Sequence, residues 1–171
     1  MSLEPGPVLR ELLGPLEPAV LQLLEQQVMV RRYPPGFAVF HEGMAPRELV
    51  LLTRGRIRLN KLRPDKRQET IANVHPVSML GLAAAVGGIP YPATAMALEP
   101  SECLLIPAHL LEQGQDPIRR SLAIELSKAC LRGMNAQLRA ANARLYSLAG
   151  DRELVEALSL DLGTWSLPLQ P

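Results

Sequence analysis

The sequence predicts a mainly β fold, a small jelly-roll-like β-roll with flanking helices and a long C-terminal helix. Three observations predict it. Short β-like runs recur at intervals of about ten residues between 37 and 106, which is the spacing of sandwiches and barrels. Glycines stand at the edges of these runs, where turns need a positive φ. From residue 116 onward, apolar residues instead recur every three or four positions, which is the helical period.

Size and composition are those of one soluble domain, or of a domain with a small appendage. The chain has 171 residues, 47% of them hydrophobic, and a formal net charge of +1. This balance argues against a protein that coats nucleic acid with basic residues. Cys103 and Cys130 are too few for a disulfide framework or a zinc site, and no apolar run approaches the roughly 20 residues of a membrane span. With no signal peptide at the N-terminus, we expect a cytoplasmic protein without membrane contact.

Residues 1–33 are predicted to be a helical lead to the roll. Four prolines divide it into short pieces, and Pro18 suits the first position of a helix. The apolar residues after it fall at helical spacings, and the turn at 33–36 is predicted to end that helix. The four apolar residues are Val20, Leu21, Leu24 and Val28.

Residues 34–112 are predicted to be the β-roll. Within the run 56–62, Ile57 and Leu59 alternate with basic residues and should face inward. Residues 63–66 predict a hairpin turn. The predicted strands are 37–40, 48–53, 56–62, 70–74, 93–98 and 103–106. The glycines at their edges are Gly36, Gly43, Gly55, Gly81 and Gly88.

Residues 113–150 are predicted to be one long helix, with Asp116 as N-cap and Pro117 as the first helical residue. Ile118, Leu122 and Leu126 lie four apart and should cover the roll. Gly150 suits the residue that ends the helix. Residues 151–171 are predicted to hold a short helix at 152–160, capped by Asp151, and an irregular tail.

The second half of the long helix has a heptad seam, with spacings of three and four. The seam predicts a homodimer formed through this helix. Its residues are Leu131, Met134, Leu138, Ala141, Leu145 and Leu148. Cys130 lies beside the seam and is interpreted as a packing residue. The basic side chains near it are interpreted as the solvated flank of the coiled coil; they are Lys128, Arg132, Arg139 and Arg144.

The segment 81–94 is rich in small residues and ends in Pro-Tyr-Pro-Ala-Thr. It resembles the phosphate-binding cassette of the cyclic nucleotide-binding domain of the catabolite activator superfamily. That family's pattern reads Phe-Gly-Glu-Leu-Ala-Leu and, after a short gap, Gly-x-Pro-Arg-x-Ala-Thr. The positions in register are Gly81, Ala83, Gly88, Pro90, Ala93 and Thr94. The segments 33–43 and 50–57 resemble the family's first strands, so the likeness covers about 20–112.

Two positions depart from that pattern. The family's acidic residue, which takes the ribose hydroxyl, is Leu82 here, and its phosphate-binding arginine is Tyr91. Pro92 also removes a backbone N–H from the turn. The sequence therefore predicts a degenerate site that does not bind cAMP or cGMP in the usual way. A less anionic ligand, with Tyr91 and Thr94 as polar contacts, stays open. The degenerate site comprises Gly81, Leu82, Ala83, Gly88, Tyr91, Pro92, Ala93 and Thr94.

The sequence offers no support for a metal site, a cofactor or a catalytic constellation. His41, His75 and His109 do not form the His-x-His pair of metal-dependent cupin enzymes, and they are interpreted as surface or turn residues. An iron–sulfur cluster needs about four cysteine ligands, and the chain has two cysteines, so iron–sulfur sensing is not expected. Haem would need only one axial histidine, but nothing in the pattern argues for it.

These observations predict a non-catalytic regulatory domain, a dimeric sensor or adaptor that could act on another regulatory protein. One alternative is a transcription regulator of the same family whose helix-turn-helix is absent from this chain. Only residues 151–171 come after Gly150, so direct DNA binding is not expected. A second alternative, weakened by the missing histidine pair, is a cupin-type enzyme.

Overall fold

The computed structural model describes residues 5–112 and 114–149 of the chain. These belong to two units, Met1–Met134 and Asn135–Pro171. The first unit contains the strands, the shorter helices and the beginning of the long helix α4 (Pro117–Ala149). The described part of the second unit is the remainder of α4.

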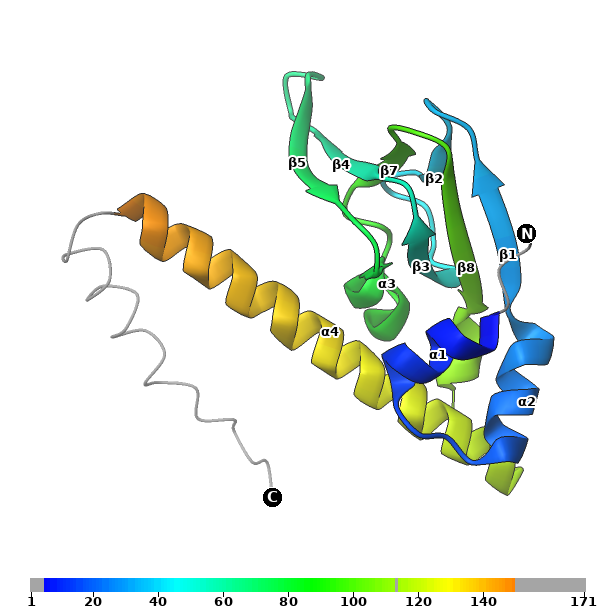
Figure 1. The fold of residues 1–171 in the computed structure, drawn as a ribbon. Helices are drawn as coiled ribbons and strands as arrows, with labels where there is room; N and C mark the ends of the chain where they lie inside the picture. Colours follow the sequence, from blue (N-terminus) through cyan, green and yellow to red (C-terminus); the bar gives the residue numbers. More distant parts are fainter. Residues whose placement is uncertain (1–4, 113, 150–171) are drawn as a thin grey trace. The chain divides into compact units, whose positions relative to one another are not determined.

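Eight strands form two antiparallel four-stranded sheets (Figure 1). One sheet has the order β1-β8-β3-β6 and the other has the order β2-β7-β4-β5. This arrangement confirms the predicted mainly β roll with flanking helices. The strands are β1 (Met29–Tyr33), β2 (Ala38–Phe40), β3 (Glu48–Arg54), β4 (Ile57–Leu62), β5 (Gln68–Val74), β6 (Ser78–Leu80), β7 (Thr94–Ala97) and β8 (Ser101–Pro107).

Side chains along the strands of the first sheet point alternately to its two faces. The core is therefore divided into an outer cluster, which contains the helices, and an inner cluster, which lies inside the roll. In β3, Leu49 and Leu51 pack with the helices, while Val50 and Leu52 pack inside the roll with residues of the second sheet. Such a strand is apolar on both faces, which explains its continuous run of apolar residues. Ile57 is fully buried and Leu59 packs partly against the inner cluster, so both face inward as predicted.

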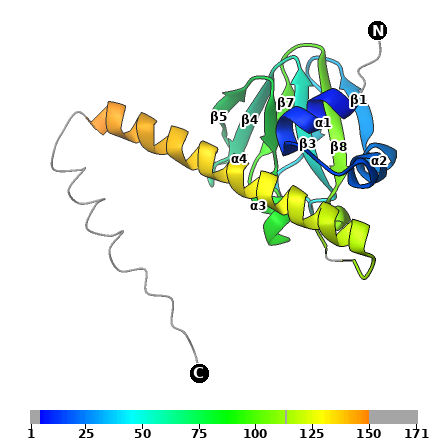
Figure 2. The same ribbon diagram turned by 60° about the horizontal axis from the view of Figure 1, so that its bottom comes forward.

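Residues of α1 (Pro5–Leu13), α2 (Pro18–Gln27), α3 (Leu82–Gly87), α4 and a short 3-10 turn, η1 (Ala108–Leu111), form one cluster with residues of the first sheet. In Figure 2, α1 crosses in front of β3 and β8. Leu9 and Leu24 are fully buried in this cluster. The predicted start of α2 at Pro18 is confirmed, with Pro18 in its first turn.

The N-terminal lead differs from the sequence prediction at its end. The helix was expected to run to the turn at residue 33, but α2 ends at Gln27 and Met29–Tyr33 forms β1. The four residues of β1 before Tyr33 are all exposed, so this strand has no buried face over most of its length. Without a buried face, its sequence shows no alternation of apolar and polar residues from which a strand could be predicted. The three-residue strand β6 was also not predicted.

The start of α4 follows the predicted capping. The Asp116 Oδ1 accepts a hydrogen bond from the Ile118 N–H at 3.4 Å, and Pro117 is the first helical residue. Leu122 and Leu126 are buried as predicted, but Ile118 is 40% exposed and does not cover the roll. Positions four apart rotate by about 40° per step around a helix, so Ile118 falls at the rim.

Gly150, the helix at 152–160 and the tail to 171 lie outside the described residues. All five glycines predicted at strand edges have a positive φ, between 62° and 88°. Within the described residues, no helix is both long and apolar enough to cross a membrane.

Replacement of Gly55 by alanine tests the corner between β3 and β4. An added Cβ would lie 2.7 Å from the carbonyl oxygen of Pro100 and against Ser101, at a φ of +88°. Gly36 has a similar φ of +83° but open space around it. We expect Gly36→Ala to lose about 1–2 kcal/mol of unfolding free energy from backbone strain, and Gly55→Ala to lose more because backbone must also move. Equal losses in urea denaturation would contradict this packing.

The two buried thiols predict a loss of stability at alkaline pH. Burial raises the pKa of Cys103 to about 12 and that of Cys130 to about 11, from 9.0. Above pH 9 the unfolded thiols lose protons that the folded ones keep, so the free energy of unfolding should fall as pH rises. Urea denaturation at about pH 8 and about pH 10 measures this fall. The double variant Cys103→Ala, Cys130→Ala should show a smaller fall, and an equal fall would refute the assignment.

Candidate ligand-binding cassette

The predicted cassette folds as a helix between two left-handed glycines. Gly81 (φ 71°) follows β6 and precedes α3 (Leu82–Gly87). Gly88 (φ 62°) ends α3, with its N–H donating to the carbonyl of Ala84. Left-handed backbone is accessible to glycine without the Cβ penalty, which explains why both ends of this short helix carry it. The chain then turns through residues 89–93 into β7.

Tyr91, at the position of the family's arginine, is part of the roll interior. It is 5% exposed, and its ring stacks on Phe40 with 4.0 Å between centroids and 13° between planes. Its hydroxyl donates to the Glu48 carbonyl oxygen at 2.9 Å. Burial raises the pKa of Tyr91, so the phenol stays neutral. The side chain therefore fills space in the roll rather than presenting a charge to a phosphate.

Gly81 and Tyr91 touch directly. A Cβ on Gly81 would lie 2.7 Å from Cε1 of the Tyr91 ring. The ring therefore lies against the backbone at the start of α3, and only a glycine leaves room for it. The Tyr91 N–H donates to the Met44 carbonyl and its own carbonyl accepts from the Gly43 N–H, both at 2.9 Å. These bonds fix the second half of the cassette to the turn after β2.

Leu82, at the position of the family's acid, lies in the other cluster. It is 3% exposed and packs with Met79 and with residues of α4 on the outer side of the first sheet. A Cβ on Gly133 of α4 would be 2.9 Å from Cδ1 of Leu82, so the glycine makes room for the leucine. Leu82 and Tyr91 therefore belong to two separate clusters and do not face one common space.

Gly133 was not singled out from the sequence. A glycine inside a helix costs about 1 kcal/mol relative to alanine. A glycine inside a helix otherwise rich in leucine, alanine and arginine is the sequence feature that could have indicated the close approach of another side chain to this helix.

The remaining predicted site residues do not converge on one point. Thr94 is half-buried, and its hydroxyl oxygen accepts from the Glu42 N–H at 3.0 Å. Ala93 is buried, while Ala83, Gly88 and Pro92 are exposed. The hydroxyl groups of Tyr91 and Thr94, proposed from the sequence as ligand contacts, are thus already hydrogen-bonded to the backbone of the protein.

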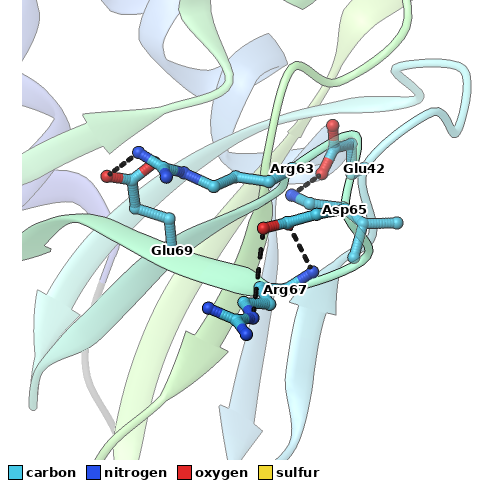
Figure 3. Close-up of polar contacts among 6 residues, drawn as sticks. Glu42, Arg63, Asp65, Arg67 and Glu69 are labelled. Atoms are coloured by element: carbon cyan, nitrogen blue, oxygen red, sulfur yellow. Dashed lines mark hydrogen bonds and ion pairs between the residues drawn. The ribbon is translucent and has the colours of Figure 1, made fainter.

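Glu42 links the end of the cassette to the neighbouring hairpin. Its Oε2 accepts a hydrogen bond from the Leu62 N–H at 2.8 Å (Figure 3), while its own N–H donates to Thr94. The sequence alone assigns no role to Glu42, which directly follows His41. In the structure, its carboxylate has a backbone partner.

Ion pairs close the predicted turn of that hairpin. Arg63 donates from Nε to Glu69 at 2.7 Å, and Arg67 lies 3.9 Å from Asp65 (Figure 3). These side chains are exposed, so the pairs contribute little to stability. The turn is otherwise held by backbone bonds between Arg63 and both Lys66 and Arg67.

The histidines lie where the sequence suggested. His41, His75 and His109 are exposed. Among the described residues, no group of three or more His, Cys, Asp or Glu side chains is placed to hold a metal ion.

The seam of α4 is only partly covered in a single chain. Leu131, Leu138 and Leu145 lie seven apart and are 61%, 62% and 51% exposed. Met134 packs partly against the outer cluster, and Ala141 is exposed. The side chain of Leu148 lies outside what the structure describes. Cys130 is buried, which confirms its interpretation as a packing residue.

Comparison with known proteins supports the resemblance. Residues 30–114 match the family model of the cyclic nucleotide-binding domain. A CRP-like cAMP-activated global transcriptional regulator of Mycobacterium tuberculosis is 26% identical over 135 residues, which cover 78% of this chain. The chain spans 57% of that relative's length.

Solved structures show the same fold. A cyclic nucleotide-binding domain from Methylobacillus flagellatus superposes with a TM-score of 0.65 at 20% identity, over 80% of each chain. The catabolite activator protein of Thermus thermophilus superposes with a TM-score of 0.58 at 23% identity, over 81% of this chain and 62% of that one. Residues 30–114 of the chain therefore belong to the family of cyclic nucleotide-binding domains.

Proposed function

We propose that this chain is a non-catalytic regulatory domain whose degenerate cassette works without cAMP or cGMP. The observation that carries the proposal is the buried Tyr91, which is stacked on Phe40 and bonded to the Glu48 carbonyl. A family member that holds a cyclic nucleotide is expected to use an arginine there. The interior of the roll is instead packed with this protein's own side chains.

Energetics favour the same conclusion. A charge-assisted hydrogen bond contributes about 1.5–3 kcal/mol, and this chain lacks both the acid and the arginine. Leu82 offers no hydrogen bond, and its position between β6 and α4 leaves a carboxylate there no solvent. Loss of both contacts corresponds to a weakening of affinity by orders of magnitude.

The proposed output of the domain is a dimer formed through α4. Its exposed leucines form a stripe at heptad spacing, and each leucine buried in a partner contributes about 1.5–3 kcal/mol. The contact between Leu82 and Gly133 joins the cassette to the helix that carries this stripe. A dimeric adaptor that acts on another regulatory protein fits this arrangement, and the two free buried cysteines suit the cytoplasm.

A second candidate is a transcription regulator whose helix-turn-helix is absent from this chain or supplied by a partner. The observation in its favour is the relative from M. tuberculosis, which is described as a transcriptional regulator and of which the chain spans 57%. A helix-turn-helix encoded directly downstream of this chain's coding sequence would support this candidate over the first.

Cyclic nucleotides should not stabilise the protein. A ligand at 100 times its dissociation constant raises the free energy of unfolding by about 2.7 kcal/mol, which is readily seen in a thermal melt. We expect no shift with cAMP or cGMP at about 1 mM, a concentration 100 times a dissociation constant of about 10 μM.

The relative described as cAMP-activated provides the positive control for this experiment. Calorimetry provides the independent measurement. Saturable binding of either nucleotide to the unmodified chain with a micromolar dissociation constant would overturn the proposal.

The chain should be a dimer in solution, with a mass twice the 18.7 kDa of one chain. Leu138→Asp places a charge in the proposed seam and should convert the dimer to a monomer, because a buried unpaired carboxylate is costly. Light scattering after size exclusion measures the mass of both proteins.

The matched control is Ala140→Asp, which adds the same charge two positions away on an exposed site of the same helix. It should leave the dimer intact. A concentration-independent monomer for the unmodified chain, or equal effects of the two variants, would refute the dimer.

A further inference from the structure

A groove lies on the first sheet at the end where β1 leaves the roll and β8 enters it. Its volume is about 460 Å³, and its apolar lining includes Pro34, Pro35 and Pro100. Glu102 of β8 also lines it and pairs in register with Arg32 of β1 and Arg54 of β3. The groove contains none of the cassette residues, so binding there is independent of the proposed function.

Glu102 is a buried acid with an unused acceptor. The residue is 6% exposed, and its Oε2 accepts from the Arg32 Nε at 2.8 Å. Its Oε1 is buried and has no hydrogen-bond partner among the described residues. A buried carboxylate oxygen without a donor is costly, and such atoms are rare in folded proteins. Because this oxygen is itself shielded, a ligand in the groove meets it only if the Glu102 carboxylate turns toward the groove that the residue lines, and a donor there would then lower the free energy.

The two arginines leave the groove with an excess of positive charge. Among the described residues, Arg54 has no ion-pair partner, and Arg32 is 68% exposed although it is paired with Glu102. A cationic ligand would be repelled by this pair of guanidinium groups. An anion would be attracted, and Arg32 can keep its Nε on Glu102 while the remaining N–H groups of its exposed guanidinium bind the anion.

We propose that this groove binds a small sugar phosphate. A phosphate monoester carries more negative charge than a carboxylate and has three terminal acceptor oxygens, so it can pair with both guanidinium groups. A sugar hydroxyl donates to Glu102, which supplies the missing hydrogen bond. The carbon face of the sugar lies on the three prolines. A volume of about 460 Å³ is within the range of small-molecule sites and suits a ligand of this size.

The test compares glucose 6-phosphate, glucose and inorganic phosphate by calorimetry on the full chain. Glucose 6-phosphate should bind tighter than either of the other two, because only it presents both the anion and the hydroxyl donors. Backbone amide signals of residues 32–33 and 101–102 should shift in NMR spectra during its titration. No saturable binding of glucose 6-phosphate, or equal binding of inorganic phosphate, would overturn the proposal.

Two variants separate the contributions of the groove. Arg54→Gln should weaken glucose 6-phosphate binding about tenfold or more, as expected for loss of a charge-assisted contact. Arg58→Gln, an exposed arginine of β4 in the other sheet, is the matched control and should leave the affinity within about twofold. Glu102→Gln keeps the shape of the side chain but makes it a weaker, uncharged acceptor, and should reduce the preference for glucose 6-phosphate over inorganic phosphate. Binding that survives Arg54→Gln unchanged would place the ligand elsewhere.

Discussion

The contact between the Tyr91 ring and the backbone of Gly81 is the constraint on which the cassette depends. It requires a glycine with left-handed backbone at one end of α3 and a flat, buried side chain at the other end of the segment. The same tyrosine stacks on Phe40 and donates to the carbonyl of Glu48, so it joins β2, β3 and the cassette. One residue thus holds these three parts of the roll together by packing and a hydrogen bond.

A second apolar contact links the cassette to the long helix. Leu82 fits beside Gly133, which has no side chain to obstruct it. Leu82 and Tyr91, the two positions that depart from the predicted cassette pattern, are therefore both occupied by side chains suited to a dry interior.

Charged groups are kept to the edges of the roll. Glu42 receives the Leu62 N–H at the hairpin, and Glu102 receives Arg32 at the opposite sheet. The two acids differ in their surroundings. The exposed hydrogen bonds at the hairpin suit a structural role, whereas Glu102 is buried and lines a groove of about 460 Å³. The hydrogen-bonded hairpin and the groove lined by Glu102 thus belong to different sheets of the roll.

The sequence by itself determined the class of fold, the start of α2 at Pro18, the Asp116 cap and the central strands, because these depend on local spacing and capping. It did not reveal β1, whose exposed residues have no alternation, or β6, which is only three residues long. It also treated Leu82 and Tyr91 as parts of one site. Only the tertiary structure decided that these residues enter different clusters, because the face on which a side chain is buried depends on which sheets and helices pack around it.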